Sequence, residues 1–147
     1  MENMKNSKNV TKLNIDQIMT CLSGNMLMGK MDDIYETLNS LLGVEVYTHL
    51  IPTGLAICNS IIRDKIGFQM AMDLVGDMYK ECKDKNRDTR TDGIVINMNK
   101  YKEWKKERGY ENFEIEIDKL SDEDVEKVKY QFGEAEENLF GVKVVGW

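Results

Sequence analysis

The spacing of apolar residues changes once along this chain, and this change restricts the possible folds more than any other feature. Up to about residue 83, apolar side chains recur every three or four positions, which is the period of an amphipathic helix. Beyond residue 92, short apolar or alternating segments typical of strands are interleaved with helical patterns. We therefore predict an α+β protein, in which a helical N-terminal half packs with a small three-stranded mixed sheet and two helices in the C-terminal half.

Four helices are predicted in the N-terminal half. The first begins after Asn14, whose side chain forms a capping-box pattern with Gln17. Residues 44–50 alternate briefly between apolar and polar side chains, which indicates a short extended piece that ends at Pro52. The helices are expected over residues 14–24, 32–43, 53–67 and 70–83.

The C-terminal half combines strand and helix patterns. Phe113, Ile115 and Ile117 alternate with acidic residues, which indicates a strand with one buried and one acidic face. Ser121 is a suitable N-cap for a helix that follows. The strands are expected at residues 93–97, 113–117 and 142–145, and the helices at residues 101–108 and 121–133.

The length of the chain favours one domain. A chain of 147 residues buries roughly 70% of its unfolded surface on folding, which is enough for one core. The polar residues 1–13 are predicted to be a disordered lead, and residues 14–147 a single α+β domain. A possible sub-boundary lies at residues 83–92, because KDKNRDTRTD contains no apolar residue.

The composition of the chain indicates its cellular location and the metals and cofactors that it could bind. No apolar run approaches the roughly 18 residues of a membrane span, and the polar N-terminus does not resemble a secretory signal, so we expect the cytoplasm. The dispersed Cys21, Cys58 and Cys82 favour reduced thiols over disulfides. With a single histidine, no short ligand spacing and no glycine-rich phosphate loop, we expect neither a metal nor a cofactor.

Residues 22–52 contain several motifs in a fixed order. A short apolar turn is followed by Tyr-x-x-Leu-Asn, a glycine and Thr-His-x-x-Pro. In this chain the motifs comprise Leu27, Met28, Gly29, Tyr35, Leu38, Asn39, Gly43, Thr48, His49 and Pro52. The segment resembles a family of uncharacterised domains that is common in tailed-phage and prophage genomes. The resemblance implies a phage or prophage setting, and it implies no reaction.

His49 is the only histidine, so two interpretations of it are open. As a general base it would define an enzyme or small-ligand pocket with Tyr35 and Thr48. As a structural residue it would be at least half buried and would bond to the backbone of residues 46–53 before Pro52. We expect the structural role, with Tyr35, Asn39, Thr48, His49 and Pro52 as a structural motif, and we do not expect an enzyme.

The segment 80–108 is basic and contains two aromatic residues, a combination that could bind a single nucleic-acid strand. Acidic residues are interspersed through it, and Tyr101, Trp104 and Arg108 follow a helical spacing. We therefore expect Trp104 to be buried by sheet residues such as Ile96 or Ile115, and we do not expect direct binding of nucleic acid.

Residues 109–147 carry four basic and eleven acidic side chains, a net charge of −7. A row of carboxylates can imitate a phosphate backbone and occupy a basic groove on another protein. The alternative is a solvated face and a helix start that favours negative charge. The predicted binding residues are Glu114, Glu116, Asp118, Asp122, Glu123 and Glu126.

Together these features predict a non-enzymatic accessory protein of a phage or mobile element. Its expected partner is a host protein in the bacterial cytoplasm, such as a nucleic-acid-binding effector of a CRISPR defence system, and it would act as an inhibitor. The alternatives are a small-ligand binder or enzyme near residues 35–49 and a nucleic-acid-binding regulator that uses residues 80–108.

Overall fold

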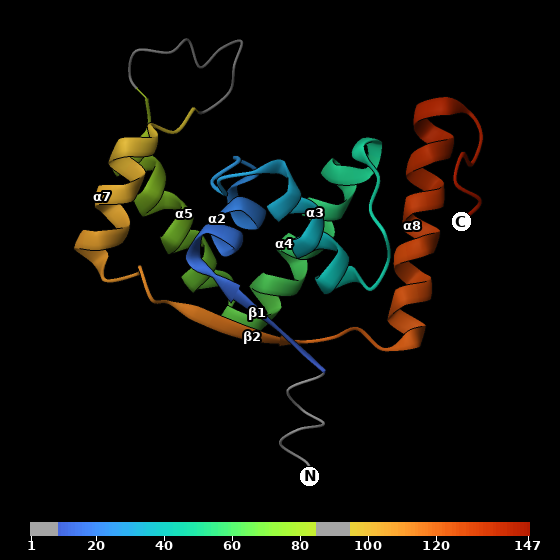
Figure 1. Cartoon of the computed structure of the whole chain (residues 1–147), viewed down its shortest axis with the longest axis horizontal. Coiled ribbons are helices and arrows are strands. Elements are labelled where there is room, and N and C mark those ends of the chain that lie inside the picture. The colour runs from blue at the N-terminus through green and yellow to red at the C-terminus, as the bar shows by residue number, and fades with distance from the viewer. Residues whose placement is uncertain (1–8, 85–94) are drawn as a thin grey trace.

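A computed structural model of the chain describes residues 9–84 and 95–147. In this part the protein is an α+β structure, with six α-helices and one two-stranded antiparallel sheet (Figure 1). In chain order the elements are β1 (Val10–Asn14), α2 (Ile15–Ser23), α3 (Met31–Leu42), the 3₁₀ helix η1 (Thr48–Leu50), α4 (Ile51–Ile66), α5 (Phe68–Cys82), α7 (Met98–Arg108), β2 (Glu114–Asp118) and α8 (Asp122–Phe140).

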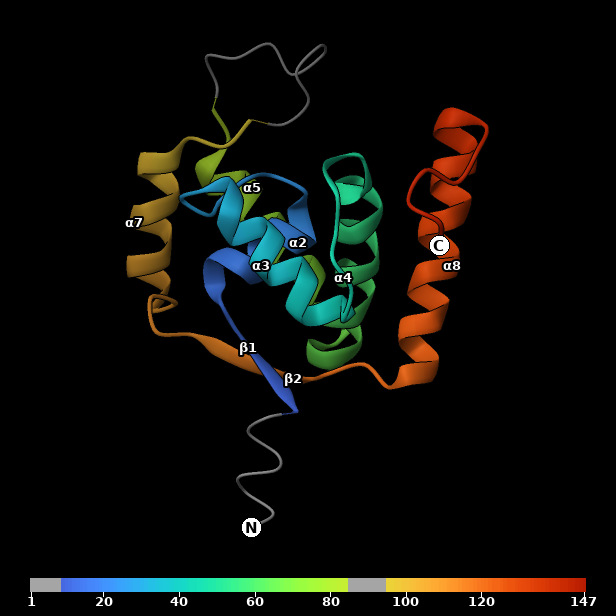
Figure 2. The same cartoon turned by 45° about the vertical axis from the view of Figure 1, so that its right-hand side comes forward.

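Helices α2 to α5 form the body of the protein, and α4 contacts α2, α3 and α5. Helix α7 packs against α5 at one end, and α8 stands beside α4 at the other end (Figure 1). The β1–β2 ribbon runs beneath the helices, and the chain passes through β2 from α7 to α8 (Figure 2). The fully buried core includes Leu13, Ile18, Leu38, Leu50, Ile62, Met78, Tyr101, Trp104 and Phe132.

The prediction of a three-stranded mixed sheet is wrong for the described residues. The sheet has two antiparallel strands, in register from Val10 opposite Asp118 to Asn14 opposite Glu114. The predicted lead also extends too far, because residues 10–13 belong to β1 and Leu13 is fully buried. The partner strand lies about a hundred residues further along, so no local pattern marks β1 as a strand.

Within the described part of the chain, neither of the other two predicted strands forms. In the predicted strand 93–97, the first two residues lie outside the described part, and Ile96 makes a single bridge with Lys83. This bridge joins the end of α5 to the start of α7. Residues 85–92 of the predicted linker also lie outside the described part. Val142, Val144 and Val145 are exposed and irregular after α8, and no strand of the described residues pairs with them.

Local signals place most helix boundaries correctly. The capping box before α2 is confirmed: Asn14 Oδ1 accepts from Gln17 N at 2.9 Å, and Gln17 Oε1 accepts from Asn14 N at 2.8 Å. The extended piece at 44–50 is wrong, because residues 48–50 form η1 and Pro52 lies in the first turn of α4, where proline is favoured.

Helix α8 continues past Gly133, where we expected it to end, and reaches Phe140. Gly133 is buried, and a Cβ at this position would lie 3.1 Å from Lys143 Cε and 3.5 Å from Trp147 Cβ. The absent side chain therefore lets the C-terminal segment approach the helix, and it does not mark a helix end.

Gly43 ends α3 with φ of 71°, and a Cβ there would lie 2.9 Å from Cγ2 of Val125 on α8. Gly43→Ala is expected to lower the free energy of unfolding by about 2–3 kcal/mol, because left-handed strain adds to this clash. Gly24→Ala is the control, since Gly24 has φ of 75° with no atom within 4 Å of its Cβ position, and it should cost only about 1–2 kcal/mol. If the two variants lost the same unfolding free energy in urea, the result would contradict the contact between α3 and α8.

Candidate functional site

The carboxylates predicted to bind a partner are all exposed. Along β2, Glu114, Glu116 and Asp118 face solvent, while Ile115 is half-buried and Ile117 is buried, so the predicted alternation is confirmed. Three more carboxylates, Asp122, Glu123 and Glu126, are exposed where α8 begins, close to β2 in the sequence. We call these six residues the acidic surface.

Among the described residues, few cations neutralise the acidic surface. Lys12 lies opposite Glu116 on the neighbouring strand. On α8, Lys127 Nζ is 4.0 Å from Glu123 Oε1, and Lys129 Nζ is 3.3 Å from Glu126 Oε1. Exposed pairs of this kind are worth about 0–1 kcal/mol each, so they leave the carboxylates available to another partner.

Part of the acidic surface also stabilises α8. Ser121 Oγ accepts a hydrogen bond from Asp124 N at 3.2 Å, and Asp122 and Glu123 lie in the first turn, where the helix dipole favours negative charge. Glu114, Glu116 and Asp118 are on a strand and have no such role. A test of partner binding should therefore alter the strand carboxylates.

His49 does not bond to the backbone of residues 46–53, so that part of the prediction is wrong. Its Nε2 lies 2.6 Å from Oε2 of Glu136, and its side chain is 26% exposed while that of Glu136 is fully buried. The other oxygen of Glu136 accepts from Val144 N at 3.1 Å and from Val145 N at 3.2 Å. Glu136 thus ties η1 and the C-terminal segment to α8.

The pKa of Glu136 reflects two opposing effects. Burial of the carboxylate would raise this pKa. The hydrogen bonds from His49 and from the backbone N–H groups of Val145 and Val144 outweigh burial, and they hold the pKa below its ordinary value of 4.5. The carboxylate therefore stays ionised inside the protein.

The sequence analysis did not single out Glu136, although a signal for it exists. Val128, Phe132 and Glu136 follow one another at four-residue intervals and are all buried on α8. A carboxylate that continues an apolar stripe needs a buried partner, because an unpaired buried charge is costly.

The other residues of the motif in 22–52 hold a loop against α3. Tyr35 Oη and Thr48 Oγ1 are 2.6 Å apart, and Asn39 Oδ1 accepts from Val46 N at 2.8 Å. Tyr35 and Thr48 therefore bond to each other, while the imidazole of His49 bonds to Glu136. The structural role of the five residues of the predicted structural motif stays a prediction.

The aromatic residues of the basic segment are buried. Trp104 is 2% exposed, as predicted, and its Nε1 donates to Asp77 Oδ2 at 2.8 Å, so α5 provides a partner that the sequence prediction of sheet contacts did not include. Tyr101 Oη donates to Asp16 Oδ1 at 2.6 Å. Because both rings lie in the core, they offer no exposed stacking face for a nucleic-acid strand.

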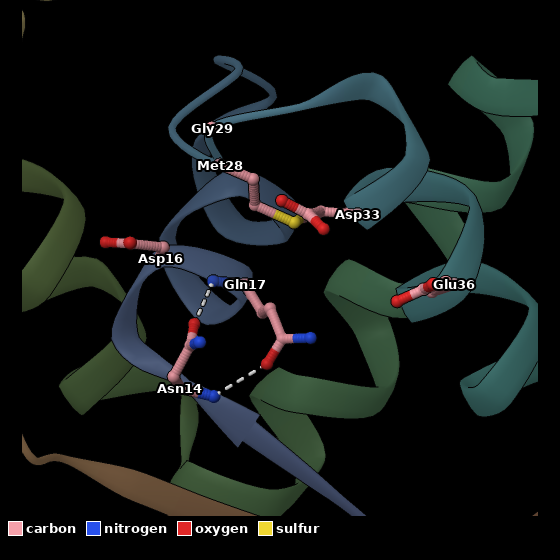
Figure 3. Close-up of a pocket in the computed structure, with 7 residues that line it drawn as sticks. All are labelled: Asn14, Asp16, Gln17, Met28, Gly29, Asp33 and Glu36. Atoms are coloured by element: carbon pink, nitrogen blue, oxygen red, sulfur yellow. Dashed lines mark hydrogen bonds between the residues drawn. The ribbon is translucent and has the colours of Figure 1, made fainter.

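A small hollow of about 190 Å³ lies between the start of α2 and α3 and contains Asp16, Asp33 and Glu36 (Figure 3). Asp16 points away from the other two carboxylates and accepts hydrogen bonds from Tyr101 and Lys105. Within residues 9–84 and 95–147, no group of three or more histidine, cysteine or acidic side chains is arranged to hold a metal ion.

Comparisons with models of known protein families, with curated proteins and with solved structures found no match. The resemblance of residues 22–52 to a phage domain family therefore remains a prediction. Among the described helices, none combines the length and apolar character needed to cross a membrane. Cys21, Cys58 and Cys82 are free and buried.

Proposed function

We propose that this chain is a non-enzymatic accessory protein of a phage or mobile element, and that it binds a host protein through the acidic surface. The partner is a nucleic-acid-binding effector in the bacterial cytoplasm, such as a CRISPR effector, whose basic groove the carboxylates occupy in place of phosphates. Binding of this kind inhibits the effector. The phage setting rests on the resemblance of residues 22–52.

The observation that carries the proposal is the exposed row Glu114, Glu116 and Asp118. Residues of one strand face are separated by two positions, or about 6.6 Å, which approaches the spacing of successive phosphates along an extended strand. Ion pairs within 4.0 Å do not occupy these three carboxylates among the described residues. An anionic face on a ribbon also favours fast, charge-steered association.

The test is a pull-down from bacterial lysate with the Glu114→Lys/Glu116→Lys variant and the wild type. The wild type is expected to retain a nucleic-acid-binding protein that added duplex DNA or high salt releases, because DNA and the acidic surface would compete for one groove. The double reversal should reduce capture about a hundredfold or more, since it changes the net charge of the surface by four. Circular dichroism should show an unchanged fold, because both side chains are exposed.

The matched control is Glu103→Lys/Glu107→Lys, which makes the same charge change on exposed positions of α7, the helix that precedes β2 in the chain. It should retain most of the binding. If the control and the β2 variant lose binding equally, net charge alone is responsible. If the β2 variant and the control both still capture the partner, and neither salt nor DNA releases it, the acidic surface has no role in binding.

A further inference from the structure

A hollow of about 650 Å³ lies between the end of α2 and one face of α4. Its apolar lining includes Leu22, Pro52 and Leu55, and its polar lining includes Asn59, Ser60 and Arg63. Its volume is within the range of about 300–1,000 Å³ that is common for small-molecule sites. The residues of the acidic surface do not contribute to it.

Among the residues that the structure describes, Arg63 is the only charged one that lines this hollow. Its Nε is buried without a hydrogen-bond acceptor, and the guanidinium makes no ion pair within the described part of the chain. By contrast, Arg108 lies within 4.0 Å of carboxylate oxygens of Asp77, Glu81 and Glu107. In a chain with 26 acidic residues, an arginine without a carboxylate in a concave site requires an explanation.

The helix dipole does not sufficiently explain why Arg63 lies in this hollow without a carboxylate partner. Arg63 lies in the last turn of α4, where a cation is favourable, but the exposed Lys65 lies in the same turn and supplies that charge in solvent. The wall of the hollow is also fixed, because Asn59 Nδ2 donates to the carbonyl oxygens of Cys21 and Leu22 at 3.2 and 3.1 Å. The site is therefore held in shape by contacts between α2 and α4.

We infer that this hollow binds a small monocarboxylate that carries an apolar body. The planar guanidinium of Arg63 would hold the carboxylate through two parallel hydrogen bonds, and Leu22, Pro52 and Leu55 would pack against the body. A carboxylate fits better than a phosphate, because one cation balances one negative charge and no second cation of the described residues lines the hollow. This site is independent of the proposed function of the acidic surface.

The inference can be tested by NMR titration of the full chain with 3-phenylpropionate. We expect dissociation constants of about 1 mM, typical of such small ligands, with shifts at Leu22, Leu55 and the Nε–H of Arg63. Arg63→Gln should weaken binding about tenfold or more, because it removes the charge and the paired donors. Lys65→Gln, which removes the same charge two residues away, should change binding less than about twofold.

Two further probes and one variant complete the test. The neutral 3-phenylpropanamide and phenyl phosphate should both bind about tenfold or more weakly than the carboxylate. Ala56→Phe, at an exposed position that lines the hollow, should block binding without changing charge or fold. Any one of four results would overturn the inference. These are no binding at about 10 mM, equal binding by the amide, tighter binding by the phosphate, and wild-type affinity in Arg63→Gln or Ala56→Phe.

Discussion

Trp104→Ala is expected to lower the free energy of unfolding by about 3–5 kcal/mol. The indole is almost completely buried and stacks on Tyr101, with ring centroids 5.9 Å apart. Its ring centroid also lies 5.2 Å from that of Tyr110. Its removal also leaves Asp77 without one of its hydrogen-bond donors. Urea unfolding followed by circular dichroism measures the loss, because the substitution removes a fluorescent probe.

Trp104→Phe separates packing from hydrogen bonding. It keeps an aromatic ring against Tyr101 and loses only the bond to Asp77 and part of the volume, so it should cost about 1–2 kcal/mol. Lys102→Ala, at an exposed position of the same helix, should change stability by less than about 0.5 kcal/mol. If Trp104→Ala also cost less than about 0.5 kcal/mol, α7 would not pack against α5 in solution.

Glu136→Ala is expected to cost about 3 kcal/mol of unfolding free energy. The substitution removes the acceptor of the Val144 and Val145 N–H groups and the partner of His49, and a hydrogen bond to a charged group contributes about 1.5–3 kcal/mol. Limited proteolysis should then cleave near residues 141–147, because Glu136 holds this segment to α8. Unchanged stability together with unchanged protease resistance would refute the role of Glu136.

The same carboxylate makes stability depend on pH. Because the pKa of Glu136 in the folded protein lies below its ordinary value of 4.5, its contribution is present above pH 4.5 and is lost as the pH falls through the folded pKa. Acid unfolding of the wild type should therefore be steeper below pH 4.5 than that of Glu136→Gln, which keeps the shape and an acceptor oxygen but does not titrate. Identical acid profiles would show that Glu136 does not remain ionised in the fold.

The sequence alone determined the features that depend on neighbouring residues. The capping box at Asn14 and Gln17, the glycine after α3 and the Ser121 cap lie within a few positions of the groups they satisfy. The alternation around Ile115 and Ile117 likewise placed the acidic residues of β2 in solvent, because successive side chains of a strand point to opposite faces. The exposure of Glu114, Glu116 and Asp118 was predictable for this reason.

Only the tertiary structure decided which distant segments meet. The pairing of β1 with β2 and the bond between His49 and Glu136 join residues 87 or more positions apart, and the hollow beside Arg63 exists only because α2 and α4 pack together. The valines at 142–145 have a strand-like composition, yet neither described strand pairs with them, so they remain irregular. Periodicity reports which face of an element is apolar, and it carries no information about which distant element covers that face.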